Sequence, residues 1–481
     1  MTTENIEKNE TIVKNANPIN DVPKVNFGRK ELNGFSKITI DFEEKLEKEV
    51  LHSLPSEAQI TFAKFEGTNI ALYTKNPEFS LTELTLHLSA LSKSLKKRFI
   101  IRTDQSIRLT EEETRTEIIK ILPKDISVSV IFCDDATGEV ILEVNKPEGI
   151  TSDIFLKIAK VTGWIAHTRR SPHIPSNSIK NIHSTLKSSS KERQNFYHIL
   201  GKRIFRPILL SNNLLKSVNY SDNGNTGNDK FIPGSSNHIP KNYNIGPSNY
   251  HYNNLKEVLI YCLGGVKQVG RSCFVVVTPE SKVMLDCGIN PGENQSYNAY
   301  PRIDWFNFNL EELDAVVISH AHIDHQGFLP ALYKFGYKGP VYCTEPTLPL
   351  MTLLQMDSVK ISKNNGTYIP YELRDVNEII KHCIPIPYGK PTDISPDITI
   401  TLNNAGHIMG SATVHINISG THNVLYTGDY KYAKTQLLDS AISNYPRVET
   451  IITESTYGSS IDIMPDQYTV YNTFTESINN S

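Results

Sequence analysis

The stretch LDAVVISHAHIDHQGFLPALYKF, residues 313–335, decides the fold of this chain. Its apolar run AVVIS (315–319) predicts a buried strand, and GFLPALYKF (327–335) predicts a helix. The polar loop between them has the pattern HxHxDH, at His320, His322, Asp324 and His325. Imidazole nitrogens and carboxylate oxygens are ligands that zinc takes in proteins. We therefore predict a zinc site on a strand-to-helix loop.

The alternation within this loop aims its side chains at two neighbouring positions. We expect His320 and His322 to face a first metal ion, and Asp324 and His325 to face a second. The alternative is a polar loop with a chance run of histidines. Four candidate ligands within six residues, between a buried strand and a helix, disfavour that alternative.

Three residues outside this loop fit the same site. Asp286 ends the run KVMLD, Asp429 ends NVLYTGD, and His407 lies in the glycine-flanked stretch NNAGHIMGSA. An aspartate at a strand end is, alone, more often a cap or a turn residue. Together with the HxHxDH loop, these residues form an ordered set that suits one scaffold of two sheets.

Residues 257–450 contain many buried-strand runs with helical segments between them. This pattern predicts an α/β fold, an αββα sandwich with its chemistry on loops at one edge of the sheets. Upstream, residues 35–105 and 106–170 each combine helices with a hairpin, in units of about 65 residues. We expect these units to be two small α+β modules.

The remaining segments have little core-forming sequence. Residues 171–256 form a basic, proline-punctuated connector with an Asn-rich insertion at 221–254, and residues 1–34 are a polar tail that we expect to be disordered. The formal net charge of −3 neither indicates nor excludes a nucleic-acid partner.

The sequence gives no sign of a membrane or an oxidising compartment. There is no apolar stretch long enough to cross a bilayer, and the N-terminus lacks an apolar signal core. The six cysteines form no CxxC pair, so we expect them to be small buried hydrophobes. We expect a cytoplasmic protein without a membrane partner.

The motifs together resemble a known family. The order of ligands matches the metallo-β-lactamase superfamily, and ETIITESTYG resembles the entry to its β-CASP branch. Strings such as LGGVKQVGRSCF, LDCGINPG and NAGHIMGSA resemble the archaeal relatives of the cleavage and polyadenylation specificity factor nuclease. The resemblance covers about residues 36–210 and 257–460, and it identifies the two upstream modules as KH-like RNA-binding domains.

The resemblance implies a role for each site residue. His320, His322 and His407 would bind the first zinc, Asp324 and His325 the second, and Asp429 both. Asp286 would orient a ligand histidine, and Glu454 would support the general acid. Asp286, Asp324 and Glu454 are the residues that we assign to catalysis. The implied activity is a zinc-dependent ribonuclease, cutting internally and from the 5′ end, in archaeal transcription termination and 3′-end processing.

The implied partners are single-stranded RNA, RNA polymerase with its elongation factors, and a second copy of the chain. Residues 451–481 resemble the start of a β-CASP domain, and we expect a truncated form because the family's two later histidines come after Ser481. The second zinc then lacks one terminal ligand. We expect a first site of normal affinity, a weaker second site and impaired activity for this chain alone.

The upstream modules depart from the KH pattern, in which a GxxG loop clamps the nucleic-acid backbone. The second module has Gly149-Ile150-Thr151-Ser152, without the second glycine, and the first has no such loop. RNA contact would then rest on Gly149 and on a set of basic residues. These are Lys96, Lys97, Arg98, Arg102, Arg169 and Arg170. The alternative is a surface that docks proteins such as RNA polymerase.

Two other functions stay open. One is a small-molecule hydrolase of the same superfamily, acting on a thioester or a lactam. The other is a catalytically weak RNA- or polymerase-binding protein with a vestigial metal site, which the missing histidines favour.

Overall fold

A computed structural model describes residues 47–205 and 258–480, apart from 49, 96, 174–175, 294–295, 306–308 and 464. The chain divides into two compact units, Met1–Leu46 and Glu47–Ser481, and every described residue belongs to the second. The predictions for the tail at 1–34, the insertion at 221–254 and Lys96 lie outside the described residues.

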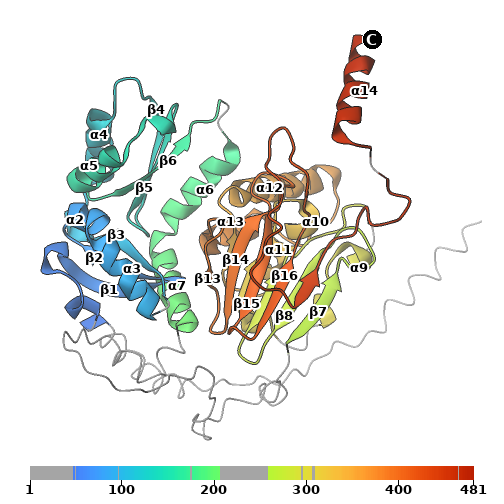
Figure 1. Cartoon of the computed structure of the whole chain (residues 1–481), viewed down its shortest axis with the longest axis horizontal. Coiled ribbons are helices and arrows are strands. Elements are labelled where there is room, and N and C mark those ends of the chain that lie inside the picture. The colour runs from blue at the N-terminus through green and yellow to red at the C-terminus, as the bar shows by residue number, and fades with distance from the viewer. Residues whose placement is uncertain are drawn as a thin grey trace, which may run out of the picture. The chain divides into compact units, whose positions relative to one another are not determined.

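The first small module is built on a three-stranded sheet (Figure 1). Strand β1 (Ile60–Glu66) pairs antiparallel with β2 (Asn69–Thr74), which pairs parallel with β3 (Phe99–Thr103). A parallel pair needs a crossover connection. Helices α2 (Pro77–Thr82) and α3 (Leu84–Leu95) provide it. The short 3-10 helices are η1 (Ser56–Ala58) before β1 and η2 (Gln105–Ile107) after β3.

The second module repeats this topology. Strands β4 (Val128–Asp134) and β5 (Glu139–Val144) are antiparallel, and β6 (Ile165–Arg170) lies parallel to β5. The first strand of each module also has an irregular register near its start. Helix α4 (Glu111–Ile121), the 3-10 helix η3 (Pro147–Gly149) and helix α5 (Ser152–Thr162) complete it. The two α+β modules are as the sequence repeat predicts.

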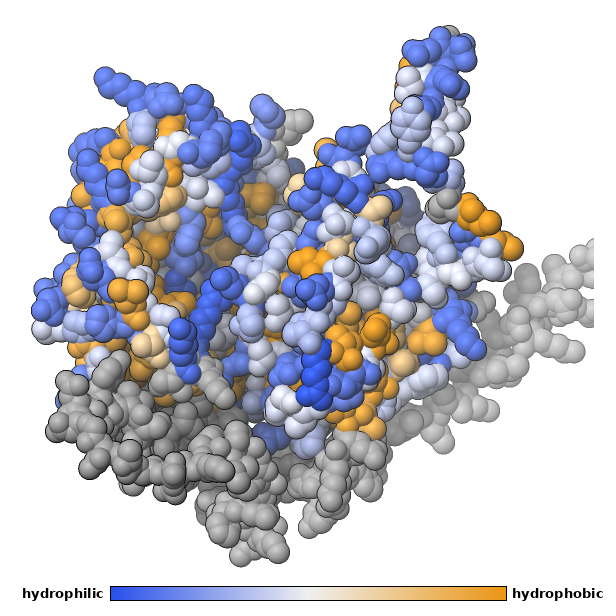
Figure 2. Space-filling view, viewed as in Figure 1, coloured by the Kyte–Doolittle hydropathy of each residue, from blue (hydrophilic) through white to orange (hydrophobic). Residues whose placement is uncertain are grey.

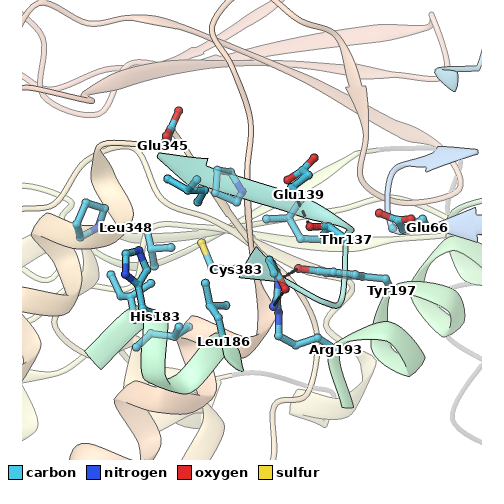
Figure 3. A pocket seen from close by; sticks show the side chains of 18 of the residues that line it. Glu66, Thr137, Glu139, His183, Leu186, Arg193, Tyr197, Glu345, Leu348 and Cys383 are labelled. Carbon is cyan, nitrogen blue, oxygen red and sulfur yellow. Dashed lines mark hydrogen bonds and ion pairs between the residues drawn. The ribbon is translucent and has the colours of Figure 1, made fainter. Parts of the chain in front are cut away.

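Helices α6 (Asn177–Ser188) and α7 (Ser190–Ile204) follow the second module. Buried ion pairs join α7 and the two modules around a cavity of about 290 Å³ (Figure 3). Arg102 pairs with Glu66 of its own module at 2.6 Å and also with Glu139 of the second module. Arg193 of α7 pairs with Asp134 at 2.8 Å. Because each guanidinium has its carboxylate, we interpret this cavity as a structural junction.

Two larger sheets follow (Figure 1). The six-stranded sheet has the order β12-β11-β10-β9-β8-β7, and the five-stranded sheet has the order β13-β14-β15-β16-β17. The strands of the first are β7 (Leu259–Gly264), β8 (Cys273–Val277), β9 (Lys282–Leu285), β10 (Ala315–Val317), β11 (Val341–Cys343) and β12 (Cys383–Pro385). Those of the second are β13 (Thr392–Asp393), β14 (Ile398–Asn404), β15 (Ala412–Ile418), β16 (His422–Tyr426) and β17 (Thr450–Ile452).

The two sheets share one apolar core. Val276, Val317 and Val414 are among its fully buried members, and they come from both sheets. Helices cover the other face of the six-stranded sheet, where Met284 and Ile379 belong to a second core. These helices are α10 (Ile323–Gln326), α11 (Leu329–Lys334), α12 (Thr347–Asn365) and α13 (Leu373–His382). The predicted α/β class with two packed sheets is confirmed.

Several short elements lie outside these layers. They are α9 (Ser296–Ala299), η6 (Ile303–Trp305), η7 (Leu310–Glu312) and the exposed helix α14 (Gln467–Asn479). Figure 2 shows hydrophobic residues on the viewed face in patches that hydrophilic residues interrupt. None of the described helices is long and apolar enough to cross a membrane. Five of the six cysteines are buried as expected, but Cys262 is exposed, because its side of the edge strand β7 faces away from the core.

Candidate metal centre

The strand directions bring the candidate ligands to one edge of the sheets. Strands β9 and β10 are parallel, so Asp286 after β9 and the His320 loop after β10 emerge at the same end. Strands β16 and β17 are parallel as well, which places Asp429 and Glu454 together beyond their ends. The fold therefore gathers residues that are more than a hundred positions apart.

Backbone hydrogen bonds from neighbouring segments hold the HxHxDH loop in place. The Ser272 amide donates to the Asp324 carbonyl at 2.9 Å, and the Cys287 amide donates to the His325 carbonyl at 2.7 Å. At Gly288 a Cβ would lie only 1.6 Å from the Asp324 carbonyl oxygen. Glycine at this position is what allows the two loops to approach so closely.

The first group of ligands is His320, His322, His407 and Asp429. The Nδ1 atom of His322 lies 3.1 Å from Nε2 of His320 and 3.1 Å from Nε2 of His407. The Oδ2 atom of Asp429 lies 3.8 Å and 3.7 Å from the same Nε2 atoms. Zinc–nitrogen bonds of about 2.0–2.1 Å in a tetrahedron set nitrogens about 3.3 Å apart. The donor set and its spacing therefore fit a zinc-sized ion.

The second group is Asp324, His325 and Asp429. The Nε2 atom of His325 lies 3.6 Å from Oδ2 of Asp324 and 3.2 Å from Oδ1 of Asp429. Asp429 thus presents one carboxylate oxygen to each group, which is the arrangement of a bridging ligand. Among the described residues this group offers three ligand atoms, whereas the first offers four.

The pKa shifts of the histidines differ between the two groups of ligands. Burial, together with the neighbouring histidines, holds the pKa of His320 well below its usual range, and burial also lowers the pKa of His407. A lowered pKa favours the neutral imidazole, which is the form that binds a metal ion. For His325, burial lowers the pKa, but hydrogen bonds to Asp286 and Asp429 outweigh it and raise the pKa to about 10. A cation at this position would replace the proton's charge between the carboxylates.

Asp286 is fully buried and accepts four hydrogen bonds. Its donors are the Ser319 amide at 2.7 Å, the Ser319 hydroxyl at 2.6 Å, Nδ1 of His325 at 2.7 Å and the Tyr426 hydroxyl at 2.6 Å. The bond to Nδ1 leaves Nε2 of His325 facing the second group. The φ of Asp286 is +56°, a strained value for a residue with a side chain. The structure thus gives Asp286 the contact that orienting a ligand histidine requires.

Sequence reasoning missed two residues of this support. The Ser319 hydroxyl also lies 3.0 Å from Nδ1 of His320, and through Asp286 it is linked to Nδ1 of His325. Tyr426 reaches Asp286 from the other sheet. Each stands close to a ligand in the sequence, Ser319 directly before His320 and Tyr426 three residues before Asp429. This closeness in sequence to a ligand is the signal by which both residues could be predicted.

Glu454 lies near the centre without touching a ligand. It accepts hydrogen bonds from the Tyr430 amide at 3.1 Å and the Thr456 hydroxyl at 2.8 Å. Its charge also acts on the pKa of His407. Glu454 therefore faces the segment directly after Asp429.

The basic residues selected as RNA contacts are not brought together at the metal centre. Arg102 is buried, and its guanidinium is paired with Glu66 and Glu139. Lys97 pairs with Asp393 at 2.6 Å, and Arg98 is exposed. Arg169 and Arg170 are each more than a third exposed and pair with Glu345 at 2.8 Å and Glu148 at 2.9 Å. Gly149 is exposed and ends η3, just before α5.

Comparison with known proteins agrees with this architecture. Residues 275–456 match the metallo-beta-lactamase superfamily domain, and residues 40–108 match the KH domain of transcription termination factor FttA. The FttA of Cenarchaeum symbiosum is 40% identical over 439 residues, covering 89% of this chain and 61% of that protein. Over the residues that align, this chain is similar to the FttA proteins.

A second FttA, from Methanothermobacter thermautotrophicus, is 38% identical over 428 residues, covering 88% of this chain and 60% of that protein. The chain thus spans about 60% of the length of the curated FttA relatives that it matches. The solved metallo-beta-lactamase fold protein YhfI from Bacillus subtilis aligns at 18% identity with a TM-score of 0.24, covering 36% of this chain and 63% of that chain. That alignment is too weak to bear on function.

Proposed function

We propose that this chain is a zinc-dependent ribonuclease that acts in transcription termination and 3′-end processing of RNA. One observation carries the proposal: two groups of histidine and aspartate ligands share Asp429 at the edge of a metallo-β-lactamase sandwich. Paired metal sites of this kind suit the hydrolysis of phosphodiesters, because both oxygens of an in-line displacement can be stabilised.

The residues divide the work by position. His320, His322 and His407 offer imidazole nitrogens to one position, and Asp324 and His325 offer ligands to the other. Asp286 fixes the ring of His325 through its Nδ1. Zinc held there would supply Lewis acidity, lowering the pKa of water and offsetting the charge of the phosphate. Glu454 stands beside this centre, where it can support the protonation of a leaving group.

The choice of zinc follows from the donor set. Three imidazole nitrogens and one carboxylate suit zinc, whereas magnesium and calcium prefer sites built of oxygens. We propose that the second position binds zinc more weakly, because the described residues offer it one ligand atom fewer.

We propose RNA as the substrate because the matched KH domain belongs to a type that binds nucleic acid. The relatives are named as termination factors, so RNA polymerase with its elongation factors is the proposed protein partner, and a second copy of the chain is another. A small-molecule hydrolase is disfavoured, because the KH match gives no reason to bind a thioester.

The test compares the wild-type chain with His322→Ala and with His52→Ala as a matched control. His52 is exposed in the first module and belongs to neither ligand group. Zinc content, cleavage of single-stranded RNA and RNA affinity are measured for each variant. We expect His322→Ala to lose zinc and cleavage while RNA affinity stays within about twofold, since the modules are separate from the metal centre.

Cleavage that survives in the zinc-free variant would contradict the proposed activity. A chain that binds RNA and zinc but never cleaves would favour the second candidate, an RNA- or polymerase-binding protein. The three-ligand second group is the observation that supports that candidate.

A further inference from the structure

Two exposed aromatic rings are held over one arginine near the edge of the six-stranded sheet. The guanidinium carbon of Arg302 lies 4.8 Å from the centroid of the Tyr297 ring and 4.4 Å from that of the Trp305 ring. Tyr297 on α9 is 65% exposed, and Trp305 at the end of η6 is 58% exposed. The two rings together present exposed aromatic surface at one place.

The arginine serves to hold the rings. Its Nε and Nη2 donate to Asp304 at 2.9 Å and 2.6 Å, and its amide donates to the Leu263 carbonyl at 2.9 Å. The Arg302 side chain is only 19% exposed. Its charge is therefore already paired, and the accessible part of this cluster is aromatic.

Short hydrogen-bonded links join this cluster to the metal centre. Arg271 donates from Nη1 to the Tyr297 carbonyl at 3.1 Å, and the next residue, Ser272, donates its amide to the Asp324 carbonyl at 2.9 Å. On the other side of the loop, the Asn290 amide donates to the Ala299 carbonyl at 2.8 Å. The residue before it, Ile289, donates to the Ile323 carbonyl at 3.1 Å. The aromatic cluster is thus fixed to the loop that carries Asp324.

We propose that Tyr297 and Trp305, braced by Arg302, are a stacking platform for the unpaired bases of single-stranded RNA beside the metal centre. The inference rests on the proposed function, because it gives a binding site to the RNA that the proposed function takes as its substrate. Every base offers a face that stacks on aromatic rings and on guanidinium planes. A duplex keeps its bases stacked inside the helix, so this platform selects single strands. A platform at this place would hold the strand on segments that are hydrogen-bonded to the loop carrying the metal ligand Asp324.

Tryptophan fluorescence reports this contact directly, because the chain has only two tryptophans. Trp164 is 3% exposed and donates its ring N–H to the Leu109 carbonyl, so it stays shielded from added RNA. A short oligo(A), added in the presence of a chelator to prevent cleavage, should quench the emission of Trp305. An abasic oligomer of the same length keeps the phosphates and should not quench it.

Three variants separate stacking from folding. Trp305→Ala and Tyr297→Ala should each weaken oligo(A) binding by about 5- to 150-fold, the range for loss of one stacked base. Trp305→Phe should keep the affinity and lose the quenching. Tyr468→Ala on α14 removes a ring that is 74% exposed and serves as the control without effect. Zinc content should stay unchanged throughout, which shows that the fold of the metal centre survives.

The outcomes also separate this inference from the proposed function. Zinc-dependent cleavage by a wild-type chain that shows no quenching would overturn the platform alone. Quenching by oligo(A) without cleavage would overturn the nuclease alone. Equal quenching by the abasic oligomer or by duplex RNA would contradict base stacking. Unchanged oligo(A) affinity in both alanine variants would also overturn the platform and would point to a protein as the occupant.

Discussion

Replacing Asp286 by asparagine tests whether the buried carboxylate sets the second metal position. Asp286 accepts four hydrogen bonds of 2.6–2.7 Å, one of them from Nδ1 of His325. An asparagine keeps the shape, but its amide nitrogen cannot accept, so at least one donor loses its partner. Each buried donor left unpaired costs about 1–3 kcal/mol. Loss of such a partner behind a metal ligand lowers metal affinity by about 10- to 100-fold.

We therefore expect Asp286→Asn to weaken zinc binding at the second position by about 10- to 100-fold, which is about 1.4–2.7 kcal/mol. The affinity should be measured by competition with a chromophoric zinc chelator, and the free energy of unfolding by urea titration. Asp397→Asn is the matched control, because Asp397 also accepts from two hydroxyl groups, those of Thr278 and Ser281, and belongs to neither ligand group. If Asp286→Asn bound both zinc ions as the wild type does, Asp286 would not orient His325.

Three further predictions concern the shared ligand, the loop approach and the module junction. Asp429→Ala should lower zinc affinity at both positions by at least 10- to 100-fold, the loss expected when a residue that only hydrogen-bonds to a ligand is removed. Loss of affinity at one position alone in a zinc titration would argue against a bridging role. Gly288→Ala should lower stability by about 1–3 kcal/mol in thermal unfolding, because its Cβ meets a backbone carbonyl, whereas Gly292→Ala meets only a side-chain oxygen at 3.4 Å. Burial raises the pKa of Glu139, but Arg102 and His167 together outweigh burial and lower the pKa to about 2. This carboxylate therefore stabilises the fold above about pH 4.5 and loses that effect as the pH falls toward 2, so Glu139→Gln should flatten the stability profile there; an unchanged slope would contradict the pairing.

The local motif carried most of the information about the site. The place of the HxHxDH loop in the fold can be predicted from the adjacent sequence alone. The periodicity of the sequence indicates a strand before the loop and a helix after it. Asp286 and Asp429 are predictable because each ends an apolar run. In the structure β9 lies parallel to β10 and β16 lies parallel to β17, which brings Asp286 to the His320 loop and Asp429 to Glu454. His407 lies between two glycines of positive φ, Gly406 and Gly410, that shape its loop.

Long-range pairing explains what the sequence could not provide. The sequence places Arg102 only in a set of basic residues, without showing which partner each side chain meets. The Arg102 partner Glu139 lies 37 positions away in the other module, and only the packing of the two sheets reveals the pair. Tyr426 was missed for a similar reason, since its hydroxyl crosses from one sheet to a carboxylate on the other, 140 positions away. No sequence pattern identifies the distant hydrogen-bond partner of a hydroxyl or a guanidinium group.

Anomalous diffraction at the zinc absorption edge, from crystals of this chain grown with zinc, tests the two-metal arrangement most directly. We expect two peaks about 3.5–4 Å apart. The stronger should lie among His320, His322 and His407, and the weaker between Asp324 and His325, with Asp429 touching both. A map with no peak within bonding distance of these side chains would contradict the account.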